Sequence, residues 1–173
     1  PIAVFTGGSN DPYSYYFGGK GGSGTVNHGN MDAGSFIFEL NGLRWVTDPG
    51  NQNYNDLEKE GFDLWNRSQG SQRWTLLNKS NFGHSTITVN DQLHVVDGKA
   101  TIAESMDGDQ PQLSFDLTPT FKDQLKSAKR TFTKDSNVSL IIDDNIEINE
   151  STKKITWQLI TTYDVEITTD GVT

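Results

Sequence analysis

The chain has 173 residues, of which 33% are hydrophobic, and it carries a net charge of -9 and no cysteine. This length and composition suit one globular domain with a core of its own. The acidic excess argues against binding to the phosphate backbone of nucleic acids, and the lack of cysteine excludes disulfides, thiolate metal ligands and cysteine nucleophiles. No stretch reaches the roughly 20 apolar residues of a membrane helix, so we expect no membrane span.

The first thirty positions are rich in glycine, which predicts a loop-like segment rather than regular structure. The glycines concentrate in residues 18–24, GGKGGSG. This run lacks the G-x-x-x-x-G-K-[ST] spacing of a phosphate loop and precedes no predicted helix, so we interpret it as a flexible loop. The first eight residues show no basic or apolar leader region, which fits an intracellular, a processed or an excised chain.

Alternating apolar and polar residues predict a β-hairpin at residues 35–46. Its strands, 35–40 and 43–46, flank Asn41-Gly42, a pair favoured in tight primed turns. Many short strands linked by polar turns indicate an all-β domain, either a sandwich or a barrel. The other predicted strands are residues 86–89, 93–96, 100–104, 112–116, 130–133, 138–142, 155–161 and 165–168.

Two segments carry apolar residues at near-helical spacing. One is residues 55–65, with Asp56 as a candidate N-cap, and the other is residues 120–129, with Phe121, Leu125 and Ala128. We therefore expect one or two short helices beside the strands. No repeat, linker or shift in composition divides the chain, so residues 1–173 are expected to form a single domain.

Residues that can bind a metal or move a proton surround the predicted hairpin. His28, Asn30 and Asp32 precede its first strand, and in an extended backbone these alternate residues would share one face. Asp48 follows its second strand, and His84 precedes the strand at 86–89. Because imidazole, carboxylate and amide groups all bind divalent ions, Asn30, Asp48 and His84 could meet around one metal. The alternative is that each is a hydrogen-bonded turn residue.

The four tryptophans are candidates for stacking on sugar rings. A tryptophan on an alternating strand more often belongs to the core, which we expect for Trp45 and Trp157. Trp65 and Trp74 flank the least regular segment and are better candidates for the wall of a cleft.

Basic residues also gather in the segment before His84. Arg67, Arg73 and Lys79 lie there, and they either supply positive potential for an acidic ligand or form solvated surface charge. The third histidine, His94, is flanked by Val95 and is expected to be structural.

The motifs around these residues resemble the C-terminal domain of heparinase II/III-like polysaccharide lyases. Residues 28–38, HGNMDAGSFIF, are followed by Asn41-Gly42, by Asp48-Pro49-Gly50 and by Tyr54. The family pattern is H-x-[H or amide]-x-D-x-G-[ST]-F, then a hairpin, then D-x-G. Residues 82–90, FGHSTITVN, are similar to a later strand motif, and runs at 116–119, 129–132 and 142–144 extend the resemblance over nearly the whole chain.

The resemblance implies a two-sheet antiparallel β-sandwich that, in complete enzymes, follows a helical toroid and packs against it to form the substrate cleft. Those enzymes cleave uronate-containing acidic polysaccharides, such as heparin or heparan-type glycosaminoglycans, by β-elimination. The implied partners are an acidic polysaccharide and an N-terminal helical toroid domain of the same protein, and the expected location is periplasmic or secreted. Without its toroid, we expect this domain to be inactive alone.

The resemblance also implies roles for individual residues. His28 matches a histidine that reaches the cleft and is expected to be catalytic, whereas the family's catalytic tyrosine and the residue that neutralises the carboxylate come from the toroid. Asn30, Asp48 and His84 match the ligands of a structural metal ion, commonly zinc. Many members have histidine at the position of Asn30, and an amide oxygen is a harder ligand, so zinc or calcium is expected here.

Further substrate-cleft candidates are Tyr54, Arg67, Arg73 and Trp74. A competing interpretation is a non-catalytic carbohydrate-binding or structural β-sandwich module that kept the fold and lost the chemistry. His28 favours the lyase, because a binding module has no need of an imidazole in a glycine-rich loop.

Overall fold

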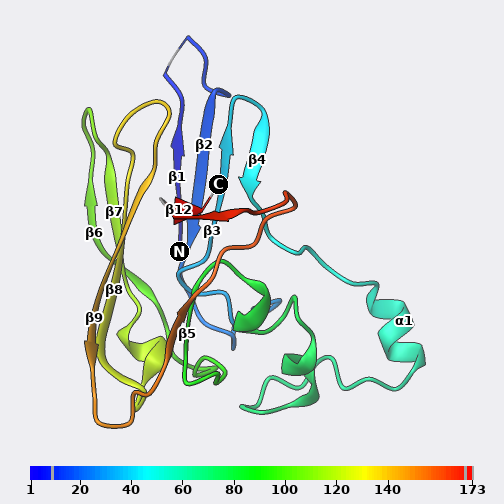
Figure 1. Ribbon diagram of the computed structural model, residues 1–173. Helices are drawn as coiled ribbons and strands as arrows, with labels where there is room; N and C mark the ends of the chain where they lie inside the picture. Colours follow the sequence, from blue (N-terminus) through cyan, green and yellow to red (C-terminus); the bar gives the residue numbers. More distant parts are fainter. Residues whose placement is uncertain (9, 170, 173) are drawn as a thin grey trace.

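The computed structural model describes residues 1–8, 10–169 and 171–172, and it shows two antiparallel four-stranded sheets (Figure 1). The expected all-β sandwich is therefore confirmed. One sheet has the order β1 (Ile2–Thr6), β2 (Tyr15–Lys20), β3 (Phe36–Leu40), β4 (Leu43–Val46), and the other has the order β6 (Thr101–Met106), β7 (Gln112–Asp116), β8 (Leu125–Thr133), β9 (Ile141–Ile148). Two short pairs join β5 (Ile87–Val89) to β10 (Ile155–Trp157) and β11 (Ile167–Thr168) to β12 (Gly171–Val172).

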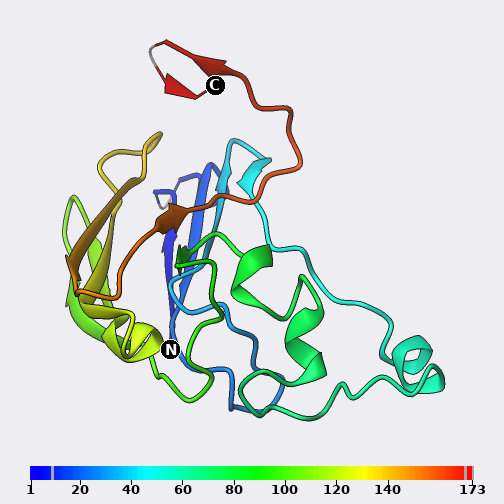
Figure 2. The ribbon, with the colours of Figure 1, turned by 60° about the horizontal axis from the view of Figure 1, so that its bottom comes forward.

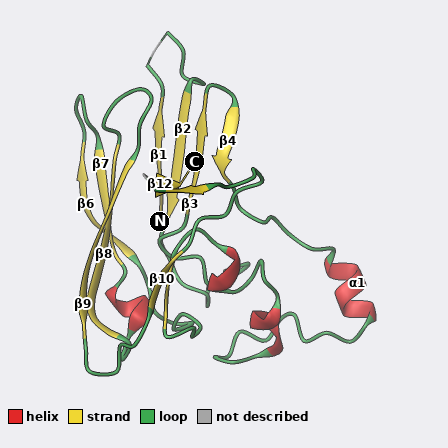
Figure 3. Cartoon of the chain, in the orientation of Figure 1, coloured by secondary structure: helices red, strands yellow, loops and turns green. Residues whose placement is uncertain are grey.

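Helical structure in the described residues is limited to short segments (Figure 3). They are α1 (Tyr54–Lys59) and the 3₁₀ helices η1 (Gln72–Thr75), η2 (Asn81–Gly83) and η3 (Thr118–Phe121). Helix α1 lies apart from both sheets in two views, and the β11–β12 hairpin also stands clear of them (Figure 2). None of these helices combines the length and apolar character needed to cross a membrane.

The core forms where the inner faces of the two sheets meet. Phe132 of β8 packs against Phe17 of β2, with ring centroids 4.7 Å apart, and against Phe36 of β3 at 5.4 Å. Phe115 of β7 completes the cluster at 6.3 Å from Phe132. Because these rings come from both sheets, their burial holds the layers together.

The hairpin prediction is confirmed. β3 and β4 pair in antiparallel register, and the turn residues Asn41 and Gly42 both adopt positive φ, 50° and 78°. This is the backbone geometry of a primed turn, which Asn-Gly adopts with little strain.

The prediction of a loop-like N-terminus is wrong, because β1 and β2 occupy much of it. In β2, Tyr15 and Phe17 alternate into the core, while Gly18 and Gly19 continue the strand. A Cβ at Gly19 would lie 2.7 Å from the ring of Phe17 and 3.3 Å from that of Phe115. Glycine is needed here for close packing, and the composition alone did not reveal this.

The helix expected at residues 120–129 is also wrong, because half of this segment belongs to β8 and its first two residues end the 3₁₀ helix η3. A register shift between Leu125 and Ser127 places Leu125 and Ala128 on the buried face together, so that they are spaced as on a helix. The helix expected at 55–65 is confirmed only over α1, and its N-cap is Asn53, whose side chain accepts from the backbone of Asn55, instead of Asp56.

Three further expectations about strands and core are wrong. Residues 93–96 form no strand. Trp45 and Trp157 are not in the core, since 46% and 48% of their surface is exposed. Trp45 lies on β4, the edge of its sheet, where it packs against Tyr163 with ring centroids 5.3 Å apart. Trp157 lies on β10, which pairs with the short strand β5.

Candidate functional site

The candidate site residues lie in loops at one end of the first sheet. Strand β2 leads into the loop 21–35 and β4 leads into the loop 47–53, and both strands finish at the end of the sheet where β3 begins. The segment carrying His84 is attached there, because the Thr86 hydroxyl donates to the carbonyl of Ala33 at 2.7 Å. The antiparallel pairing of β2, β3 and β4 therefore brings two of these segments together, and the hydrogen bond from Thr86 adds the third.

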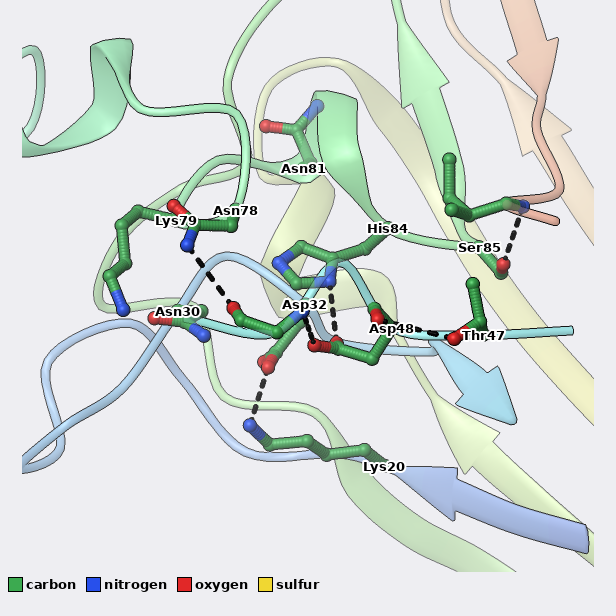
Figure 4. A network of polar contacts seen from close by, with 12 residues as sticks. Lys20, Asn30, Asp32, Thr47, Asp48, Asn78, Lys79, Asn81, His84 and Ser85 are labelled. Carbon is green, nitrogen blue, oxygen red and sulfur yellow. Dashed lines mark hydrogen bonds and ion pairs between the residues drawn. The ribbon is translucent and has the colours of Figure 1, made fainter. Parts of the chain in front are cut away.

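His84 and Asp48 meet in this region (Figure 4). His84 is 1% exposed, and its Nδ1 lies 3.1 Å from Oδ2 of Asp48. Two ligands of a tetrahedral zinc ion, each about 2.0–2.1 Å from the metal, lie roughly 3.3 Å apart, so this separation suits either a hydrogen bond or a shared ion. The other ring nitrogen of His84, Nε2, is buried and has no hydrogen-bond partner among the described residues.

The carboxylate of Asp48 is held in its charged form. Partial burial raises its pKa, but the hydrogen bonds from His84 and from the backbone N–H of Gly50, with the charges of His84 and Lys20, outweigh burial and leave the pKa below its ordinary value. Gly50 donates to Oδ1 at 2.8 Å. An ionised carboxylate with one oxygen turned toward an imidazole is a suitable ligand for a divalent ion.

Asn30 is the third expected metal ligand. Its Oδ1 accepts a hydrogen bond from Nη2 of Arg73 at 3.4 Å, and Figure 4 shows the side chain on the side toward which the free nitrogen of His84 turns. Within the described residues, no three His, Cys, Asp or Glu side chains are grouped to hold a metal. A complete site would therefore need the Asn30 amide or solvent beside Asp48 and His84.

A cavity of about 240 Å³ opens beside this pair, lined by Lys20, Asp48 and His84 together with residues of β2 and β3. At its rim, Lys20 donates to the buried carboxylate of Asp32 at 2.5 Å. Asp32 thus has a partner of its own. The expected common face of His28, Asn30 and Asp32 is wrong, because His28 has φ 57° in a turn and is exposed while Asp32 is buried.

His28 sits at the tip of the loop, and its ring stands edge-on to Trp65, with centroids 6.5 Å apart. The loop is tightly closed, because a Cβ at Gly29 would lie within 2.9 Å of three carbonyl oxygens. Arginines hold its two flanks: Arg67 donates to Oδ1 of Asn27 at 3.2 Å, and Arg73 donates to the carbonyl of Gly29 at 2.8 Å. An exposed imidazole on a fixed loop can reach a ligand without unfolding its support.

Tyr54, the first residue of α1, also contacts Trp65. Its ring stands edge-on to Trp65 at 5.5 Å, and its hydroxyl accepts from Nζ of Lys79 at 3.2 Å. Trp65 is in turn fixed by its Nε1, which donates to Glu58 at 2.8 Å. The structure therefore places the cleft candidate Tyr54 and His28 against the same tryptophan and adds Lys79, which sequence reasoning left as possible surface charge.

Two other cleft candidates do not fit the expected role. Trp74 is 3% exposed and donates through Nε1 to the carbonyl of Ser68, so its ring has little free face for a sugar. Arg73 is 1% exposed, and its guanidinium donates hydrogen bonds to the carbonyls of Leu64 and Gly29. Both side chains are turned inward to support loops.

The domain is thus an antiparallel β-sandwich that carries His28 on an exposed loop and the Asp48–His84 pair at one end of a sheet. The family model described as heparinase II/III-like, C-terminal, matches residues 16–172. The chain therefore belongs to this family. Comparison with curated proteins gives no match.

Solved structures of lyases share the fold. A heparan sulfate lyase HepC from Pedobacter heparinus is 19% identical, with a TM-score of 0.69, over 96% of this chain and 24% of that one. The heparinase III product of the BT4657 gene is 12% identical, with a TM-score of 0.69, over 98% of this chain and 24% of that one. A further heparinase III is 16% identical, with a TM-score of 0.60, over 86% and 21%. The chain thus spans about a quarter of the length of these proteins.

Proposed function

We propose that this domain is part of a polysaccharide lyase that cleaves uronate-containing acidic polysaccharides, of heparin or heparan type or related, by β-elimination. The match to the heparinase II/III-like family over residues 16–172 carries the proposal. The heparan sulfate lyase and heparinase III structures support it, since they combine this fold with a much longer chain. The proposed partners are the polysaccharide and an N-terminal helical toroid domain, and the proposed location is periplasmic or secreted.

Within this proposal, His28 is the catalytic residue that this domain contributes. Its exposure on an anchored loop supports the assignment, because a proton-transfer group must reach the sugar and keep its orientation. Tyr54 and Arg67 lie on the same surface through their contacts with Trp65 and with the His28 loop. The domain without its partner supplies half of a cleft, so we propose that it is inactive alone.

We also propose that Asp48 and His84, with Asn30, hold a structural divalent ion, either zinc or calcium. The ionised Asp48 carboxylate and the buried, unpartnered nitrogen of His84 support a metal here. Such an ion would cross-link the loop after β4 to the segment before β5. The ion would stabilise the geometry of these loops and would take no part in proton transfer.

The test is an assay of the longer protein with heparin, heparan sulfate and alginate as substrates. β-Elimination creates an unsaturated uronate, whose ultraviolet absorbance reports turnover directly. The lyase proposal predicts this product from at least one of these substrates. A full-length protein that binds the polysaccharides and yields no such product would refute it.

A second candidate function is non-catalytic carbohydrate binding, which the exposed Trp45–Tyr163 pair favours. Exposed aromatic rings are surfaces on which sugars stack. Under this alternative, Trp45→Ala would abolish glycan binding by the 173-residue chain while His28→Ala would leave it unchanged. The lyase proposal predicts instead that His28→Ala lowers turnover of the longer protein while Trp45→Ala leaves turnover unchanged.

A further inference from the structure

A short clamp near the C-terminus, residues 158–160, is hydrogen-bonded to the segments that carry Asp48 and His84. It follows β10 directly, and because β10 pairs antiparallel with β5, the chain beyond β10 continues beside the residues that precede β5. The backbone N–H of Gln158 donates to the carbonyl of Thr86 at 3.2 Å, which extends this pairing. The topology of one short strand pair therefore brings the clamp to the candidate site.

The side-chain amide of Gln158 binds the backbone around His84. Its Nε2 donates to the carbonyls of His84 and Asn81, each at 2.7 Å, and its Oε1 accepts from the Thr88 hydroxyl at 3.2 Å. Two carbonyls at Nε2 fix which end of the amide carries the nitrogen. Residues 84–86 lie between η2 and β5, outside any helix or strand, so hydrogen bonds from elsewhere have to hold their backbone.

Ile160 connects the two halves of the site through its backbone. Its N–H donates to Oγ of Ser85 at 2.9 Å, and its carbonyl accepts from the N–H of Thr47 at 3.0 Å. Ser85 follows His84 and Thr47 precedes Asp48, as Figure 4 shows. One residue of the clamp thus fixes the separation of the two chain segments on which the pair depends.

Asp48 is not held in place by burial, because 47% of its side chain is exposed. Its carboxylate bonds to His84 and to the backbone of Gly50, which belongs to the same loop. Among the described residues, the bond from Thr47 to Ile160 is, apart from the contact with His84, the tie to another segment that lies closest to Asp48 in sequence. The position of Asp48 relative to His84 therefore depends on the clamp.

We propose that Gln158 is a positioning residue that, through the clamp, sets the separation and orientation of Asp48 and His84 and so prepares them to bind a divalent ion. The inference rests on the metal site proposed above and deepens it. A ligand pair that is ordered before the ion arrives loses less conformational entropy on binding. Groups that hydrogen-bond around metal ligands commonly change the affinity by about 10–100-fold when they are removed.

The first test reports the Asp48–His84 contact in the absence of metal. In the EDTA-treated 173-residue chain, the N–H of the His84 ring that faces Asp48 should give a downfield proton NMR signal that exchanges slowly with water, because His84 is 1% exposed. His84→Gln assigns the signal by removing it. Gln158→Met keeps the length of the side chain but removes its hydrogen bonds, and it should broaden or abolish the signal.

The chain offers two controls for this test. The ring Nε2 of His94 lies 2.8 Å from the carbonyl of Ile87 and should give a second protected signal, which should persist in Gln158→Met. Gln124→Met is the matched variant, because Gln124 is a buried glutamine whose Nε2 donates to the carbonyl of Leu93 at 3.2 Å, outside the site. Both substitutions should lower the urea midpoint of unfolding, whereas only Gln158→Met should change the His84 signal.

An unchanged His84 signal in folded Gln158→Met would overturn the proposal, and so would an equal loss of that signal in Gln124→Met. Absence of the signal from the unsubstituted chain would overturn it as well, since the contact would then not exist before metal binds. If Gln158→Met does not fold, Gln158→Asn, whose amide is one methylene too short to reach both carbonyls, replaces it in the same comparison.

The second test measures the affinity for zinc and for calcium by calorimetric titration of the metal-free chain. Gln158→Met should bind the preferred ion about 10–100-fold more weakly than the unsubstituted chain, and Gln124→Met should bind it equally well. An unsubstituted chain that binds neither ion would refute the proposed metal site, and the NMR comparison would still decide whether Gln158 positions the pair. Unchanged affinity in Gln158→Met would overturn the role of Gln158 and leave the metal site intact.

Discussion

The guanidinium of Arg130 and the carboxylate of Asp144 form a bidentate pair across neighbouring strands, with Nε to Oδ1 at 2.7 Å and Nη2 to Oδ2 at 2.8 Å. Arg130 is fully buried, and its remaining nitrogen donates to the carbonyls of Gly34 at 2.8 Å and of Ser85 at 3.3 Å. Gly34 lies near the end of the loop 21–35 that carries His28, and Ser85 follows His84. One side chain of the second sheet therefore anchors both segments of the candidate site.

Arg130→Met should lower the free energy of unfolding by about 3–5 kcal/mol, because it leaves Asp144 partly buried without its partner. The double variant Arg130→Met with Asp144→Leu should recover part of this loss, since it removes the stranded charge. The exposed pair of Lys154 with Asp91 is the control, and Lys154→Met should cost about 0–1 kcal/mol. Urea denaturation measures all three, and equal stability of Arg130→Met and the control would contradict the anchoring role.

Stability should depend on pH through His94. Burial lowers its pKa to about 4, helped by the charges of His84 and Arg130 and opposed by the hydrogen bond from its ring Nε2 to the carbonyl of Ile87. An unfolded histidine titrates near 6.5, so between about pH 6.5 and 4 the unfolded chain binds a proton that the folded chain does not. This contribution is fully present above pH 6.5 and falls by about 1.4 kcal/mol for each pH unit as pH drops to 4.

The measurement is urea denaturation at several pH values across this window. His94→Gln should show a shallower loss of stability toward acid than the unsubstituted chain. His28→Gln, at an exposed position, should keep the original slope. Parallel curves for His94→Gln and the unsubstituted chain would show that His94 is not the titrating group.

Sequence patterns predicted the parts of the fold that depend on interactions between neighbouring residues. The hairpin at residues 35–46 follows from alternation and from Asn41-Gly42, because the turn and its flanking strands are neighbours in sequence. The strand β8 was mistaken for a helix because a bulge puts Leu125 and Ala128 on one face. Gly19 was mistaken for a loop residue because its role depends on Phe115, which lies far away in the chain.

In the candidate site, too, the motifs predicted some contacts, whereas the burial of individual side chains could not be predicted. The motifs around Asp48 and His84 predicted their meeting, and the structure places Nδ1 and Oδ2 at 3.1 Å. The burial of Arg73 could not be read from its position, because the guanidinium binds the carbonyl of Gly29, 44 residues away. Lys79 was likewise indistinguishable from a solvated lysine until its contact with Tyr54 was seen. Residue type and motif suggest chemistry, whereas exposure is decided by long-range packing.

The proposed metal site predicts a response to chelation. Removing a divalent ion with EDTA should lower the thermal unfolding temperature of the 173-residue chain, because an ion that binds only the folded state stabilises it by mass action. Zinc or calcium should restore it, and the more effective ion identifies the native one. Asp48→Asn should abolish the response, while Asp11→Asn, exposed and outside the site, should retain it. A chain whose unfolding temperature ignores EDTA and both ions would remove the metal from the site.

The last prediction separates the roles of the two histidines in the longer protein. His28→Ala should lower turnover by about 10²–10⁴-fold, the usual share of general acid–base catalysis, and should leave the unfolding temperature nearly unchanged because His28 is exposed. His84→Ala should first lower the unfolding temperature and the metal content, because His84 is buried beside Asp48, and should reduce turnover only as a consequence. Product absorbance, metal analysis and calorimetry on the same samples resolve the two patterns. Near-normal turnover in His28→Ala would remove its catalytic assignment and favour the binding-module alternative.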